Sequence, residues 1–241
     1  MLSARPLANR MANRLILATA LLFSAATQAE VSAQLGVVSE YMRDGISETR
    51  GKYAAQAGAG YIHSSGFYGG LWGSEIKHKA DNAHSEWDVY AGFSHSLTSR
   101  VGIDLGLTRS TFHGDWEADE KDYTDKFLRL TLDRSLVLGW RRTSNYQGSE
   151  FARRVLEASY TLHTKSFDFE FYTAQHRYME IDDDYNFGND NRDSYWHFRV
   201  GVERTYNKYD YRLTLERTNL TSDFDAGTTF QFGVHRYFDL W

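Results

Sequence analysis

Histidine and serine are the residue types in this chain that could support catalysis. The sequence contains nine histidines and no cysteine, so it holds neither a Cys-based metal site nor a disulfide framework. His63 and Ser65 are two residues apart, a spacing that places side chains on one face of a strand and would suit a lipid hydrolase. They lie at a predicted tight turn, however, and the chain has no Gly-x-Ser-x-Gly elbow, HExxH motif or phosphate loop. We therefore predict no enzymatic activity and keep a membrane-embedded lipid hydrolase as an alternative.

A second group with possible chemistry is the acidic stretch between residues 180 and 193. Oxygen atoms of Asp182, Asp184 and Asn186 would suit a hard cation such as Ca²⁺ or Mg²⁺. The spacing departs from a calcium loop, because Gly188 comes one place late and no Glu closes the loop. A solvated acidic loop is the better interpretation, so we predict no metal and no cofactor. Weak cation binding beside lipopolysaccharide phosphates is the alternative.

The dominant pattern in the chain is an alternation of apolar and polar or small residues with period two, the pattern of two-faced strands. Between Val101 and Leu107, for example, every second residue is a large apolar one. Twelve strands are predicted near 31–43, 52–62, 67–78, 86–96, 100–112, 122–132, 135–145, 152–163, 167–178, 194–205, 209–219 and 228–240. Pro6 is the only proline, which agrees with strands that pair on both sides.

The first 29 residues have the features of a secretory signal peptide. Arg5, Arg10 and Arg14 form a basic region, and the apolar stretch after them is too short to span a bilayer as a helix. Small residues up to Ala29 would suit a cleavage site. We expect a signal peptide at 1–29 and a single domain at 30–241. Removal of three arginines would make a chain of formal charge −5 still more acidic, which argues against a nucleic-acid partner.

Strand length and loop asymmetry indicate a membrane barrel rather than a soluble one. The predicted strands run to about 10–13 residues, against about 5–6 in typical soluble sheets. Tight links alternate with longer polar ones, as in a bacterial outer-membrane barrel with both termini in the periplasm. Aromatic residues are expected at the two membrane interfaces: Phe67, Phe167, Tyr206, Tyr209, Tyr237 and Phe238 at the short-turn end, and Tyr41, Trp87, Tyr123, Tyr178 and Trp196 towards the other. The predicted fold class is all-β, a single up-and-down antiparallel transmembrane β-barrel of about twelve strands.

The C-terminal strand resembles in part the signal read by the outer-membrane assembly machinery. Gln231, Gly233 and Phe238 fit the pattern of a polar residue, a glycine and spaced hydrophobics, whereas Arg236 stands where an aromatic residue is expected. We therefore expect the barrel assembly machinery, outer-membrane lipids and lipopolysaccharide among the partners.

Two segments of the chain resemble the TorF family of putative porins. They are Gly36–Tyr41 followed by Gly45-Ile46-Ser47, and Ser65–Trp72. The resemblance implies a Gram-negative outer-membrane barrel with a presumed pore role. It carries over no substrate and no binding residues.

The polar face of the strands is where a pore function would lie. The predicted pore-lining residues are Arg129, Arg141, Arg199, Arg212, Asp104, Glu157, Glu170, Glu203, Asp210 and Glu216. Charges in a low-dielectric lumen need partners or water, so two interpretations stay open. One is a hydrated, monomeric channel that passes small hydrophilic solutes and selects them by charge. The other is a lumen plugged by ion pairs, in a structural or adhesive barrel whose loops bind lipopolysaccharide or a partner.

Overall fold

The computed structural model describes residues 29–79, 81–182, 186–188, 192–221 and 223–240. The expected signal peptide, apart from Ala29, lies outside the described residues. The barrel strands are β1 (Glu30–Val38), β4 (Ala54–Ile62), β5 (Phe67–Glu75), β6 (Ser85–Ser96), β7 (Val101–His113), β8 (Tyr123–Leu132), β9 (Leu136–Thr143), β10 (Arg153–His163), β11 (Asp168–Tyr178), β12 (Ser194–Tyr206), β13 (Tyr209–Thr218) and β14 (Thr228–Asp239).

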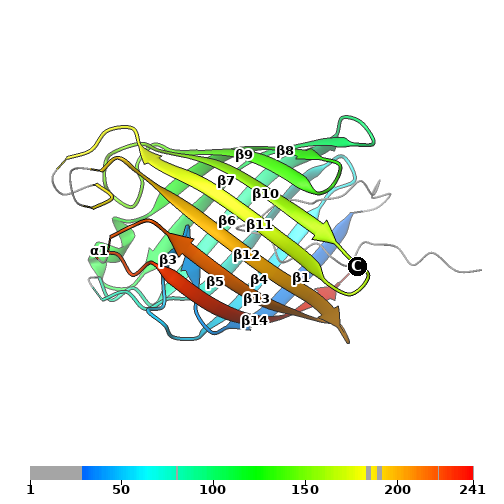
Figure 1. Cartoon of the computed structure of the whole chain (residues 1–241), viewed down its shortest axis with the longest axis horizontal. Helices are drawn as coiled ribbons and strands as arrows, with labels where there is room; N and C mark the ends of the chain where they lie inside the picture. Colours follow the sequence, from blue (N-terminus) through cyan, green and yellow to red (C-terminus); the bar gives the residue numbers. More distant parts are fainter. Residues whose placement is uncertain (1–28, 80, 183–185, 189–191, 222, 241) are drawn as a thin grey trace, which may run out of the picture.

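These twelve strands form one closed antiparallel ring. Each strand pairs with its neighbours along the chain, and β1 closes the ring by pairing with β14, with Gly36 opposite His235. The strands are strongly tilted in Figure 1, as closure of a barrel requires. The predicted fold class is therefore confirmed. No helix among the described residues is long and apolar enough to cross a membrane.

The connections differ at the two ends of the barrel. At one end the links are tight: β12 and β13 are joined by Asn207 and Lys208, both with positive φ, as in a two-residue hairpin turn. At the other end lie the long loops, one of which carries the single-turn helix α1 (Trp116–Asp119), at the left of Figure 1. In an outer-membrane barrel the long loops lie outside the cell and the tight turns in the periplasm. We refer to the two ends as the outer end and the periplasmic end.

The side chains have the inside-out distribution of a membrane barrel. On β12, Trp196, Phe198 and Val200 are 42–49% exposed on the outer face, whereas His197 and Arg199 between them are buried. This is the reverse of a soluble barrel, in which the apolar face fills the core.

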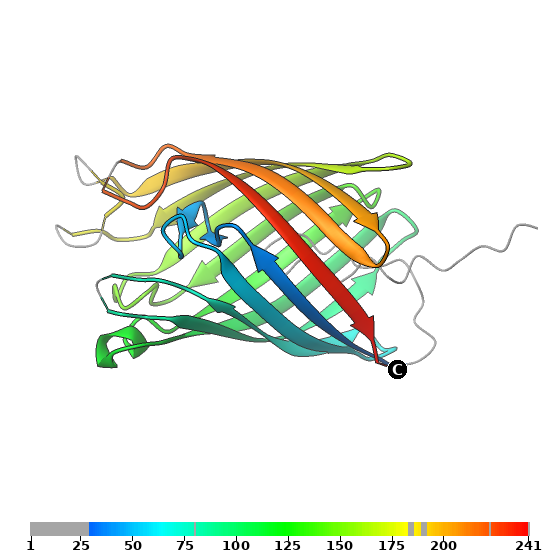
Figure 2. The ribbon, with the colours of Figure 1, turned by 90° about the horizontal axis from the view of Figure 1, so that it is seen from below.

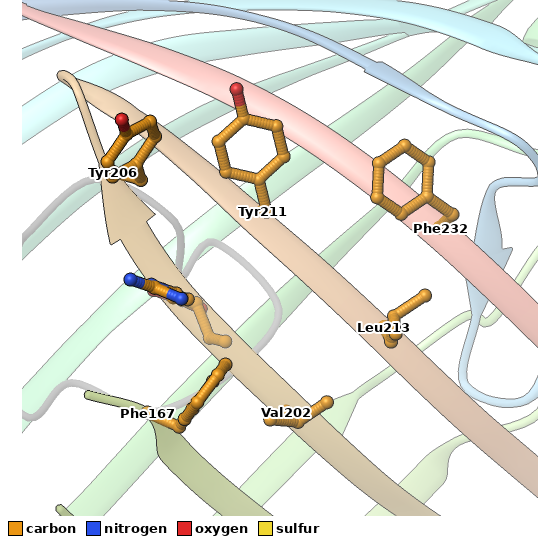
Figure 3. Close-up of a pocket in the computed structure, with 8 residues that line it drawn as sticks. Phe167, Val202, Tyr206, Tyr211, Leu213 and Phe232 are labelled. Carbon is orange, nitrogen blue, oxygen red and sulfur yellow. The ribbon is translucent and has the colours of Figure 1, made fainter.

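Aromatic residues cluster on the outer face near the periplasmic end, as the sequence predicts. A shallow apolar groove there is lined by Phe167, Tyr206, Tyr211, Phe232, Val202 and Leu213, together with Glu203 and Arg204 (Figure 3). Ring side chains at this level suit the boundary between lipid and water.

The prediction for the first strand is wrong at its end. β1 stops at Val38, and the chain then leaves the wall and forms a small hairpin of β2 (Met42–Arg43) and β3 (Ile46–Ser47). The reversal occurs at Asp44 and Gly45, which both have positive φ. Figure 2 shows this hairpin, in blue, inside the ring near the outer end.

Three aromatic residues expected at the outer interface lie inside the barrel. Tyr41, Tyr123 and Tyr178 are at most 7% exposed and belong to an interior cluster. The rings pack on one another, with Tyr123 and Tyr178 both contacting Tyr146. Packing with other aromatic rings therefore replaces the lipid contact that the sequence suggested for them.

Candidate functional site

The main feature of the lumen is the segment 41–49, which contains β2, β3 and the turn between them. We call it the lumen hairpin. All its residues are buried except Ile46, which is partly exposed. Its two central charged residues, Arg43 and Asp44, are only 7% and 4% exposed. Buried charges are costly unless paired, so their partners decide how the hairpin is held.

Arg43 binds the wall formed by β6, β7 and β8. Its Nη2 lies 3.1 Å from Asp88 Oδ2 and also contacts Glu86. Its Nη1 donates to Ser110 Oγ at 3.0 Å and to the hydroxyl of Tyr123. One guanidinium thus connects the hairpin to three neighbouring strands through charge-assisted hydrogen bonds.

Asp44 binds the wall formed by β9, β10 and β12. Its carboxylate accepts from Arg141 Nη2 at 2.6 Å and from Arg153 Nη1 at 2.7 Å. Its carbonyl oxygen accepts from the hydroxyl of Tyr195 at 3.0 Å. Since β6 and β12 stand half a turn apart in the ring, Arg43 and Asp44 together bridge the lumen from wall to wall.

An interior aromatic cluster packs against the hairpin. It contains Tyr41, Trp72, Phe112, Tyr123, Tyr146, Tyr178, Phe187 and Tyr195, with smaller apolar residues between them. Phe187 belongs to the β11–β12 loop and stacks on Tyr178 with ring centroids 4.5 Å apart. Ion pairs in the hairpin layer and aromatic packing beside it therefore occupy the lumen near the outer end.

The structure places all ten predicted pore-lining residues on the inner face of the barrel. Several form ion pairs between strands. Arg129 pairs with Glu157 across β9 at 3.1 Å, and on neighbouring strands Arg199 pairs with Glu170 at 3.4 Å and Glu216 at 3.7 Å, and Arg212 with Glu203 at 3.9 Å. Arg212 also contacts Glu170. Their part in a pore stays a prediction.

Sequence reasoning missed the charged residues that hold the hairpin. They are Arg43 and Asp44 in the hairpin, Glu86 and Arg153 on the wall, and Asp125, which contacts Arg141 and Arg153. Asp44-Gly45 is a turn dipeptide of the kind found in tight hairpins, and this signal could have revealed the reversal. Asp125 shares the side of its strand with Arg129, so the period-two pattern already placed it inside.

An outer loop also tethers the hairpin. His78, in the β5–β6 loop, lies 2.5 Å from Glu48 through Nε2 and Oε2, and the backbone N–H of Lys77 donates to the carbonyl of Glu48 at 2.7 Å. Burial opposes a charge on the His78 ring, but the hydrogen bond and charge of Glu48, together with Asp81, outweigh it and raise the pKa of His78 above its ordinary 6.5.

The raised pKa of His78 predicts a pH-dependent tether. A group whose pKa is raised on folding contributes stability below its unfolded pKa, and this contribution is lost as pH rises through the pKa of the folded state. We expect an NMR titration of His78 to give a pKa above 6.5, and the Glu48→Gln variant to lower it. A His78 that titrates at or below pH 6.5 in the wild-type protein would contradict the tether.

The other two candidate sites receive little support. Asn186 Nδ2 donates to the carbonyl of Asp182 at 3.1 Å, and Asp184 lies outside the described residues. No group of metal-ligating side chains occurs in the described part of the chain, so the cation site stays a weak hypothesis. His63 Nδ1 and Ser65 Oγ are 2.7 Å apart, but this exposed pair lies at the β4–β5 turn, at the periplasmic end. A hydrolase acting at the outer leaflet would need them at the opposite end.

Comparison with known proteins identifies the class and the family. The KdgM porin and the NanC porin each superpose with a TM-score of 0.56 and 11% identity. The alignment with the KdgM porin covers 86% of this chain and 99% of that protein, and the alignment with the NanC porin covers 88% and 100%. At this identity the likeness shows the fold alone, which is that of the outer-membrane porins. Residues 23–235 match the family described as a bacterial protein of unknown function (Gcw_chp), and the chain belongs to that family. No curated protein matches the sequence.

Proposed function

We propose that the protein is a narrow channel of the bacterial outer membrane, and that the lumen hairpin is its gate, closed in the conformation described here. The observation that carries this is the chemistry of the hairpin contacts: Arg43 forms ion pairs with β6, Asp44 forms ion pairs with β9 and β10, and Tyr195 on β12 donates to the Asp44 carbonyl. Buried ion pairs often stabilise less than apolar residues of the same volume would. When the hairpin moves, however, water can replace the protein partners of these charged groups, so the same contacts suit a movable plug.

The charge of the inner wall favours cations and neutral polar solutes. The carboxylates of the hairpin and inner wall are Asp44, Glu86, Asp88, Asp104, Asp125, Glu157, Glu170, Glu203, Asp210 and Glu216, and the guanidiniums are Arg43, Arg129, Arg141, Arg153, Arg199 and Arg212. The carboxylates are in excess, so the lumen would attract cations and repel anions.

An acidic oligosaccharide is a poor fit to this wall. One related structure, with a TM-score of 0.52 and 9% identity, is described as the KdgM porin in complex with disordered oligogalacturonate. In the present lumen the four predicted arginines each contact at least one carboxylate, as Arg129 contacts Glu157. A polyanion would have to break those pairs, which argues for small cationic or neutral solutes instead.

Planar-bilayer recording tests the proposal. We expect refolded protein to give rare, small steps whose reversal potential in a salt gradient indicates cation preference. Glu203 is the most exposed carboxylate of the inner ion pairs, at 28% of its side chain, so Glu203→Gln should lower that preference while the barrel stays folded. Folded protein that never conducts, or that prefers anions, would overturn the proposal.

A non-conducting scaffold is the second candidate, and the aromatic cluster beside the hairpin favours it. The resemblance to the TorF family of putative porins supports the channel. The partners expected from the sequence, namely lipopolysaccharide and the assembly machinery, and the monomeric state all remain predictions. The absence of enzymatic activity is likewise part of the proposal.

A further inference from the structure

A row of four basic residues crosses the outer face of the barrel near its outer end. The strand registers place Lys126 on β8 opposite Arg142 on β9, Arg142 opposite Arg154 on β10, and Arg154 opposite Arg177 on β11. All four side chains lie on the outward side of their strands. Asp125 and Phe127, the neighbours of Lys126 in the chain, are buried, and residues directly opposite each other share a face of the sheet. We call this set the basic row.

Such a row is unfavourable by itself. Residues directly opposite each other on antiparallel strands have Cβ atoms about 4.5–5.5 Å apart, and like charges at that spacing destabilise the sheet. Arg177 pairs with Asp193 at 3.1 Å, but no carboxylate among the described residues pairs with Lys126, Arg142 or Arg154. The arginines of the inner wall, by contrast, pair with carboxylates. Within the described part of the chain, Lys126, Arg142 and Arg154 thus have no counter-charge, which favours a counter-charge supplied by a ligand.

The position of the row identifies where that counter-charge lies. The next outward-facing residues towards the middle of β8, β9 and β10 are Leu128, Trp140 and Leu156, which are 36–45% exposed on the apolar belt; on β11 it is Gln175. The row therefore stands at the upper edge of the lipid-facing surface, on the side of the long loops. At that level an outer-membrane barrel meets the headgroups of the outer leaflet.

We propose that the basic row binds the phosphate groups of lipopolysaccharide, with acyl chains against Leu128, Trp140 and Leu156. A guanidinium binds phosphate through paired, charge-assisted hydrogen bonds, and phosphates along the row would remove the repulsion between its members. The inference is independent of the proposed channel, because it concerns the opposite face of the wall.

Native mass spectrometry of the refolded full-length protein with purified lipid A tests this, with EDTA present to remove bridging cations. We expect lipid A to bind more tightly than phosphatidylglycerol. The double variant Arg142→Gln/Arg154→Gln should weaken lipid A binding by at least about tenfold, since each lost guanidinium removes charge-assisted hydrogen bonds. In lipid-free detergent the same variant should be no less stable than the wild type, because it relieves like-charge contacts.

The matched control is a pair of outward-facing arginines at the other end of the barrel. Arg204 lies 5.3 Å from the ring centroid of Phe167, and Arg236 lies 4.9 Å from that of Phe238. The double variant Arg204→Gln/Arg236→Gln should leave lipid A binding unchanged. Equal weakening by both double variants, no weakening by Arg142→Gln/Arg154→Gln, or a preference for phosphatidylglycerol would each overturn the proposal.

Discussion

Replacing Asp44 by Asn is expected to open the channel. The substitution keeps the shape of the side chain but removes the charge that Arg141 and Arg153 share at 2.6 and 2.7 Å. Removing one partner of a buried ion pair costs about 3–5 kcal/mol. Arg141 and Arg153 both keep Asp125 as a partner, so we expect the lower end of this range. A loss of about 3 kcal/mol would shift the balance between docked and undocked hairpin roughly a hundredfold.

The cost should fall on hairpin docking rather than on the barrel, since Asp44 belongs to a loop and the wall strands keep their ladders. In bilayer recordings we expect the open fraction to rise steeply, with unchanged heat-modifiable mobility on gels. The matched control is Asp225→Asn, which removes a carboxylate that contacts Arg50 in a pair exposed by about half. Exposed pairs contribute about 0–1 kcal/mol, so this control should behave as the wild type. Identical traces from all three proteins would remove the hairpin from the gating scheme.

A disulfide between the hairpin and the β13–β14 loop is expected to have the opposite effect. Ile46 and Ala226 form an antiparallel bridge that joins the lumen hairpin to the β13–β14 loop. Opposite residues in such a bridge have Cα atoms about 4.5–5.5 Å apart, within the range that a disulfide spans. Because the chain has no cysteine, Ile46→Cys/Ala226→Cys would form one defined cross-link.

We expect the oxidised double variant to be silent in bilayer recordings and to regain wild-type openings after reduction with dithiothreitol. Each single cysteine variant should conduct under both conditions, which separates the cross-link from the substitutions. Conduction that persists in a fully cross-linked sample would show that solutes pass without movement of the hairpin.

The wall of the barrel could be predicted from the sequence because the alternation of residue types that specifies each strand is local and recurs from strand to strand. Alternation around Asp104 or Arg129 fixes which face is inside, and a one-residue shift would expose every charge to lipid. The same alternation placed Tyr123 inside, two residues before Asp125, but its position near a strand end suggested an interface residue instead. For Tyr123, the strand pattern was thus a better guide than the general preference of tyrosine for the membrane interface.

The lumen hairpin could not be predicted in the same way. β2 and β3 are two residues each, too short to show a period, and their stability comes from distant partners. Arg43 reaches Tyr123, 80 residues away, and Asp44 reaches Arg153, 109 residues away. Such pairs form because the closed ring brings distant strands together, and no pattern of neighbouring residues in the sequence indicates them.

The long separation between the hairpin and its partners also constrains the order of assembly. The lumen hairpin lies near the start of the domain, yet Ser47 donates to the carbonyl of Asp225, just before the last strand, and Tyr195 donates to Asp44 across 151 residues. These contacts join the hairpin to β12 and to the loop before β14, so we expect the hairpin to dock only after those parts of the wall have formed. The hairpin is therefore expected to reach its final position late in assembly, although it lies near the start of the domain.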